Sequence, residues 1–192
     1  MWLFSYDRVL HVLDMHTGRY TNLSDIIARK TGSEFLGRNS YAAAGHMWIT
    51  GDGTPLAVRA SVCDPLNPDS LEVYDASRYH SGSKLVNKVI YDRDGNEWVL
   101  SDKGIHLYGT DVWQKGRFID VCTIGGLAYM VTSDGHLYAY GHQGRSLRPM
   151  PSPQWMGRVN CMVRYDDRNL LLGTDNGIVV YNVAARAWRH IA

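Results

Sequence analysis

The chain has 192 residues, with 20 Lys or Arg side chains against 19 Asp or Glu and a formal net charge of +1. This balance leaves no overall field to attract nucleic acid or an acidic membrane surface, so we expect neither a nucleic-acid partner nor direct membrane contact. No apolar run approaches the roughly 18 residues that a spanning helix needs, and residues 1–7 lack the basic and apolar regions of a signal peptide. We therefore expect that the chain neither anchors nor exports itself.

The three cysteines give no sign of a disulfide framework or a zinc site. Cys63, Cys122 and Cys161 cannot all pair, and none belongs to a CxxC motif. They lie in or beside strand-like runs, which predicts small, buried, hydrophobic side chains.

A repeated phrase is the strongest signal in the chain. Residues 86–108 align without a gap over residues 159–181, and eight positions are identical. The identical pairs are Val86/Val159, Asn87/Asn160, Asp94/Asp167, Asn96/Asn169, Asp102/Asp175, Gly104/Gly177, Ile105/Ile178 and Tyr108/Tyr181. A repeat made of strand–turn–strand units predicts an array of small sheets.

The spacing of the units predicts the fold class. A bulky residue precedes the turn of each unit at Trp2, Trp48, Trp98, Tyr129 and Leu171, with spacings of 46, 50, 31 and 42 residues. Four-stranded propeller blades repeat at about 40–50 residues. We therefore predict an all-β protein, a β-propeller fragment of about five four-stranded blades. We expect a single domain with blades at approximately 1–30, 31–78, 79–117, 118–150 and 151–192.

The first two blades are the least regular. Blade one has strand-like runs at residues 2–5, 9–13 and 19–23, and its innermost strand is missing. Residues 23–30 predict at most one or two helical turns. Blade two has strand-like runs at residues 41–44, 47–50 and 56–60.

The last three blades carry the repeat more clearly. Blade three is the reference phrase and closes near Trp113, blade four has strand-like runs at residues 119–123, 127–131 and 136–140, and blade five extends from 159–163 to 188–191. Glycines at the hairpins supply the positive φ that tight turns need. Three polar or Pro/Gly-rich segments between blades are expected to be loops, at residues 31–40, 65–84 and 145–155. Such loops leave a propeller at the same end as the turns between second and third strands, where recognition is common.

The repeated phrase resembles a known sensor repeat. Its pattern, Val-Asn-x-Val/Met-Ile/Val followed by Asp-Gly-Asn-x-Trp-Val and Gly-Ile-x-x-Tyr, looks like that of two-component regulator propellers. Blade five departs from it at Leu171, in place of Trp98, and at Arg168, in place of Gly95. The resemblance implies the extracytoplasmic, periplasmic sensor region of a hybrid histidine kinase that detects polysaccharide fragments. Such sensors normally have two seven-bladed propellers, so this chain is expected to be a non-catalytic piece of a larger protein.

Aromatic and basic residues in or near the loops between blades are the candidate ligand site. Flat aromatic faces stack on the apolar faces of sugars, and Arg or Lys binds carboxylates or sulfates. The candidates are Arg38, Tyr79, His80, Trp113, Lys115, Trp155 and Arg158. The alternative is that these aromatic side chains only pin long loops to the outer sheets. Because they share one repeat position, Trp2, Trp48 and Trp98 are instead expected in the core between blades.

We expect no metal and no cofactor. Asp92-x-Asp94-x-Asn96 resembles the start of a calcium loop, but Glu97 and Lys103 occupy the positions where that loop needs Gly and a bidentate Glu. A hairpin turn whose side chains bond the backbone is the simpler interpretation.

Two other functions stay open. A propeller-type lyase would use a histidine as its base, and His46 and His106 are the candidates. A structural or protein-interaction propeller would use its open edge and loops to meet other blades or a second protomer.

Overall fold

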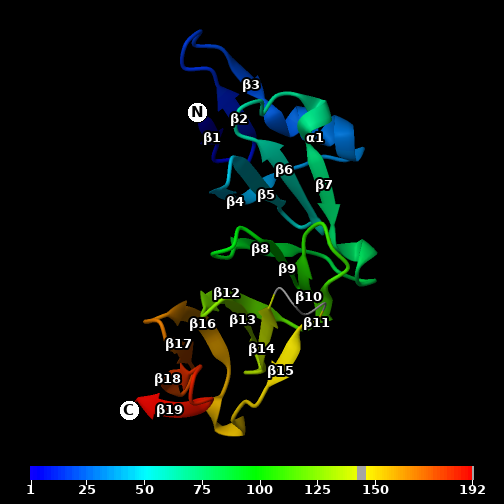
Figure 1. Cartoon of the computed structure of the whole chain (residues 1–192). Helices are drawn as coiled ribbons and strands as arrows, with labels where there is room; N and C mark the ends of the chain where they lie inside the picture. Colours follow the sequence, from blue (N-terminus) through cyan, green and yellow to red (C-terminus); the bar gives the residue numbers. More distant parts are fainter. Residues whose placement is uncertain (142–145, 192) are drawn as a thin grey trace. The chain divides into compact units, whose positions relative to one another are not determined.

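A computed structural model describes residues 1–141 and 146–191, except for the side chains of Trp2 and Phe4. Five antiparallel sheets follow one another along the chain, one of three strands and four of four strands, and strands that are consecutive in sequence are neighbours in each sheet (Figure 1). This architecture confirms the prediction of an all-β chain of propeller blades. The three-stranded sheet is the first, as the missing innermost strand of blade one predicts.

By its internal contacts the chain divides into two compact units, Met1–Val89 and Ile90–Ala192. The strands of blades one to three are β1 (Trp2–Phe4), β2 (Leu10–Leu13), β3 (Tyr20–Asn22), β4 (Gly37–Ala43), β5 (His46–Gly51), β6 (Leu56–Ser61), β7 (Glu72–Asp75), β8 (Val86–Tyr91), β9 (Glu97–Ser101), β10 (Gly104–Leu107) and β11 (Trp113–Lys115). Those of blades four and five are β12 (Phe118–Ile124), β13 (Leu127–Thr132), β14 (Leu137–Gly141), β15 (Arg148–Met150), β16 (Val159–Arg164), β17 (Asn169–Thr174), β18 (Gly177–Asn182) and β19 (Ala187–Ile191).

The first unit carries a short helix, α1 (Leu23–Thr31), against its first sheet. Asn22 caps its start by accepting a hydrogen bond from the Asp25 amide at 3.2 Å, and Gly32 ends it in the left-handed conformation at φ 75°. Its nine residues make about two and a half turns, slightly more than predicted. The helix buries Leu23, Ile26 and Ile27 in one cluster with side chains of blades one and two.

The second unit holds two apolar clusters between successive sheets. One lies between blades three and four and includes Trp98, Ile105, Phe118 and Met130. The other joins blade four to blade five. Trp98, and Trp48 in the first unit, are fully buried, which confirms their predicted place in the core; the side chain of Trp2 lies outside the described residues.

The turn after β8 is held by the side chain of Asp92. The Asp92 carboxylate accepts hydrogen bonds from the Asp94 and Asn96 amides, each at 3.0 Å, from the Asn96 side chain at 2.8 Å and from the Trp98 indole at 2.9 Å. Both of its oxygens are therefore used within the turn, and the hairpin interpretation is confirmed.

Two expectations about the chain were wrong in part. All three segments expected to be loops contain strand residues, because β4 begins at Gly37, β7 lies within 65–84 and β15 lies within 145–155. The strands β7 and β15 are short sheet edges rich in charged residues or Pro, so they lack an apolar pattern. Arg145, where the third expected loop begins, lies outside the described residues. Cys63 and Cys161 are exposed, not buried, because Cys63 follows β6 in a loop and Cys161 faces outward on β16.

Candidate ligand-binding site

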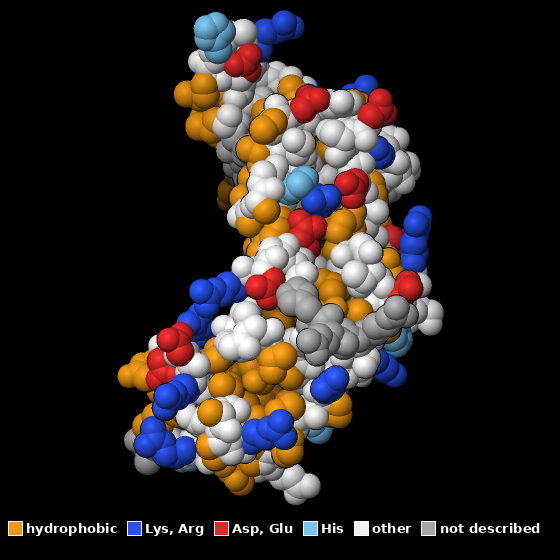
Figure 2. Space-filling view, in the orientation of Figure 1, with side chains coloured by type: hydrophobic (Ala, Val, Ile, Leu, Met, Phe, Trp, Pro, Cys, Tyr) orange, Lys and Arg blue, Asp and Glu red, His pale blue; other side chains and the backbone are white. Residues whose placement is uncertain are grey.

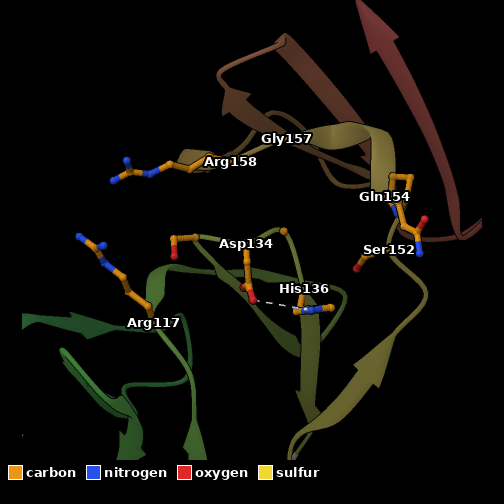
Figure 3. Close-up of a pocket in the computed structure, with 10 residues that line it drawn as sticks. Arg117, Asp134, His136, Ser152, Gln154, Gly157 and Arg158 are labelled. Atoms are coloured by element: carbon orange, nitrogen blue, oxygen red, sulfur yellow. Dashed lines mark ion pairs between the residues drawn. The ribbon is translucent and has the colours of Figure 1, made fainter.

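An open pocket of about 630 Å³ lies at one end of blades four and five, in the second unit (Figure 3). Three segments form it: the residue before β12, the β13–β14 turn, and the loop between β15 and β16. The lining residues are Arg117, Ser133, Asp134, Gly135, His136, Ser152, Pro153, Gln154, Gly157 and Arg158. These are the interblade loops and second-to-third-strand turns in which the sequence places recognition.

The β13–β14 turn is held tightly. Gly135 has a φ of 88°, which strains any residue with a Cβ, and its amide donates to the Thr132 carbonyl at 3.0 Å. A Cβ at Gly135 would also come within 3.0 Å of the Met156 methyl group. The turn thus packs directly on the loop that forms the opposite wall.

The loop between β15 and β16 is fastened at several points. Ser152 Oγ accepts a hydrogen bond from the Leu137 amide at 3.0 Å, the Trp188 indole donates to the Pro151 carbonyl at 2.9 Å, and the Asn176 side chain donates to the Trp155 carbonyl at 3.1 Å. Met156 is buried in the core between blades four and five. Because these bonds fix the loop, a ligand would not have to order this wall on binding.

Charged side chains are arranged across the pocket. Figure 3 shows Arg117 and Arg158 extending on one side, Ser152 and Gln154 on the other, and Asp134 with His136 between them. The Asp134 carboxylate lies 3.7 Å from His136 Nε2, and both side chains are exposed. Two guanidinium groups against one carboxylate suit a polar ligand that carries negative charge.

The structure separates the predicted site residues of the second unit. Arg158 lines the pocket, but Trp155, in the same loop, is half-exposed and meets the His190 ring edge-on at a centroid distance of 6.1 Å. Trp113 packs over Gly104, where an added Cβ would overlap its ring. Lys115 is exposed at the end of β11.

The predicted residues of the first unit lie in two places. Tyr79 stacks on Tyr74 at a centroid distance of 5.4 Å and an interplanar angle of 11°, which agrees with the alternative that loop aromatics pin the chain to a sheet. His80 Nδ1 lies 2.7 Å from the Ser81 carbonyl oxygen, and Arg38 is exposed on β4.

Sequence reasoning missed most of the pocket. Arg117, Asp134, His136, Ser152 and Gln154 had not been singled out as ligand contacts. One signal could have found Arg117, because it stands directly before the first strand of its blade, as Arg158 does one blade later.

The candidate bases of the lyase alternative do not line this pocket. His106 is 1% exposed, its Nε2 lies 2.7 Å from the Thr110 carbonyl oxygen, and burial lowers its pKa. His46 Nδ1 lies 3.2 Å from a guanidinium nitrogen of Arg59.

Two features are absent from residues 1–141 and 146–191, the part of the chain that the structure describes. Among them, no cluster of three or more His, Cys, Asp or Glu side chains is placed to hold a metal ion. The same residues include no helix long and apolar enough to cross a membrane.

Comparison with known proteins supports the fold but identifies no family. No protein-family model and no curated protein sequence matches the chain. The extracellular domain of the putative hybrid two-component system BT3049 from B. thetaiotaomicron is similar in structure, with a TM-score of 0.57 and 20% identity over 92% of this chain and 24% of that one.

Two further structures are similar. The corresponding domain of BT4673 from the same organism has a TM-score of 0.60 and 16% identity, over 97% of this chain and 26% of that one. The dihydro-heme d1 dehydrogenase NirN has a TM-score of 0.63 and 12% identity, over 98% of this chain and 42% of that one. This chain therefore spans about a quarter of either sensor domain. Because a sensor and a dehydrogenase both match at such low identity, the likeness shows that the chain has a propeller fold.

Proposed function

We propose that this chain is a non-catalytic ligand-recognition segment of an extracytoplasmic two-component sensor, and that it responds to polysaccharide fragments. The pocket at the end of blades four and five is the observation that carries the proposal. The repeat that resembles two-component regulator propellers and the fold shared with BT3049 and BT4673 support the sensor role. A periplasmic location belongs to the same proposal.

The size and lining of the pocket suit a small saccharide. A volume of about 630 Å³ lies within the range of about 300–1,000 Å³ common for ligand sites. Its hydroxyl, amide, carboxylate and guanidinium groups match a ligand rich in hydroxyl groups. Most ligand pockets are more apolar than this one, so the polar lining favours a sugar over a hydrophobic molecule.

Signalling would follow from a difference in affinity. A ligand shifts a conformational equilibrium only if it binds one state more tightly than the other. In the proposed sensor, saccharide binding would favour one arrangement of blades or protomers and so alter the activity of an attached kinase.

Binding of oligosaccharides to the complete chain tests the proposal. Isothermal titration calorimetry against panels of acidic and neutral oligosaccharides should find a saturable ligand, and that ligand should raise the unfolding temperature. The matched variant is Gly135→Val, which would crowd the pocket next to Met156 and should abolish binding. A panel without any saturable ligand would contradict direct sensing.

An apolar face on blade five favours a second role, docking of another sheet. Val163, Ile178 and Ile191 expose 52%, 47% and 42% of their surface on this face. Figure 2 shows hydrophobic side chains at the surface in the part of the view where Figure 1 labels β17 and β18, two strands of blade five. We propose that a further blade-like sheet, from other blades or a second protomer, covers it. If light scattering shows concentration-dependent association that Ile178→Lys abolishes, a second protomer is the partner; a strict monomer excludes that version.

A further inference from the structure

We infer that Arg117 and Arg158 form an anion clamp, and that the pocket therefore takes saccharides bearing a carboxylate or sulfate group. This inference rests on the proposed function for the saccharide and on the geometry of blades four and five for the charge. It concerns a pair of residues supplied by the same position of two successive repeats.

The repeat position is defined by a backbone hydrogen bond. In blade two the Asp52 amide donates to the Leu36 carbonyl at 2.8 Å; in blade four the Ser133 amide donates to Arg117 at 2.8 Å. In blade five the Asp175 amide donates to the Arg158 carbonyl at 3.0 Å. Each acceptor directly precedes the first strand of its blade. The backbone needs only a carbonyl here, so the side chain is not dictated by the hydrogen bond that places it.

The same bonds place the two arginines on either side of one residue. Ser133 donates its amide proton to Arg117, and its own carbonyl accepts a hydrogen bond from the Val159 amide at 2.9 Å, next to Arg158. Figure 3 shows both guanidinium groups extending toward the same side of the pocket. Blade packing thus fixes the two side-chain origins on opposite sides of the β13–β14 turn.

The residues that line the pocket include two arginines and one carboxylate. Asp134 is the one carboxylate among the lining residues, and it already lies 3.7 Å from His136. Arginine stays protonated at all physiological pH values, and its planar fork binds carboxylate or sulfate oxygens in pairs. Ser133, Ser152 and Gln154 remain for hydroxyl groups of the same ligand. A small acidic saccharide satisfies both halves of the pocket.

Titration of the complete chain with matched ligands tests the clamp. The probes are a digalacturonate, a sulfated galactose disaccharide, neutral galactobiose and inorganic sulfate, each measured by calorimetry at low ionic strength. The variants are Arg117→Gln and Arg158→Gln. The control is Arg168→Gln, which removes a charge from the β16–β17 turn, at the other end of blade five.

We expect the acidic disaccharides to bind more tightly than galactobiose. Each clamp substitution should weaken their binding by about tenfold or more, since hydrogen bonds to charged groups are the stronger ones. Galactobiose binding should change less than twofold, and Arg168→Gln should change nothing. The tighter of the two acidic disaccharides identifies carboxylate or sulfate as the natural group.

Other outcomes separate the clamp from the proposed function. If galactobiose binds as tightly as the acidic disaccharides, or if both clamp variants bind them normally, the clamp is overturned and saccharide recognition stands. If no saccharide binds, but sulfate binds to the unaltered chain and not to either clamp variant, saccharide sensing is overturned and the anion site stands. If nothing binds, both are overturned.

Discussion

The hydrogen bonds of Asp92 predict a large and specific loss of stability for Asp92→Ala. This change leaves the indole N–H of the fully buried Trp98 without its acceptor, which costs about 1–3 kcal/mol. Loss of the bonds from the Asp94 and Asn96 amides, each at 3.0 Å, costs about 0.5–1.5 kcal/mol apiece. The expected total is about 2–6 kcal/mol of unfolding free energy.

A double-mutant cycle isolates the buried part of this loss. Trp98→Phe removes the indole donor, so Asp92→Ala should cost about 1–2 kcal/mol less in that background. Urea unfolding of the full chain, followed by circular dichroism, measures all four proteins. Equal costs of Asp92→Ala in both backgrounds would refute the reasoning, because the indole bond would then contribute nothing.

Three further predictions concern packing and protonation. Ile105→Ala should lower the unfolding free energy by about 2–5 kcal/mol, because Ile105 is 0% exposed. Ile178→Ala, at the same repeat position, should lower it by under about 1 kcal/mol, because Ile178 is 47% exposed. Equal losses of free energy in urea unfolding would contradict this. Gly104→Ala should lower the unfolding temperature by several degrees, because its Cβ would overlap the Trp113 ring; an unchanged temperature would show that the ring moves freely. Burial lowers the pKa of His106. Its imidazole therefore stays neutral in the folded chain at pH values at which it binds a proton in the unfolded chain. The stability that the neutral imidazole contributes is therefore fully present above pH 6.5 and is lost as the pH falls below that value. The loss is at most about 1.4 kcal/mol per pH unit. The unfolding free energy of His106→Asn should lack this part of the pH dependence.

The sequence could predict the inner strands of the sheets. The runs at 97–101 and 177–182 are nearly continuous in apolar residues, and each forms an inner strand of its sheet. The outer strands β7 and β15 could not be predicted in the same way. One reads Glu-Val-Tyr-Asp and the other Arg-Pro-Met, and pairing with one neighbour is enough to hold such edges.

The pocket was harder to predict than the fold. The prediction of Arg158 rested on its place in a loop, whereas Arg117 stands alone between Gly116 and Phe118 and looks like an ordinary solvated charge. Only the hydrogen bonds of the Ser133 backbone show that the two residues flank one turn. Trp113, an aromatic side chain near a loop, covers a glycine of its own sheet, and the sequence pattern gives no sign of that contact.

The repeat also shows that one residue type at one blade position can be buried in one blade and exposed in another. Ile105 and Ile178 are the same residue at the same place in their blades, yet only Ile105 is covered, by side chains of blade four such as Phe118 and Met130. The same side chain is therefore buried in blade three, where the next blade packs on its face, and exposed in blade five.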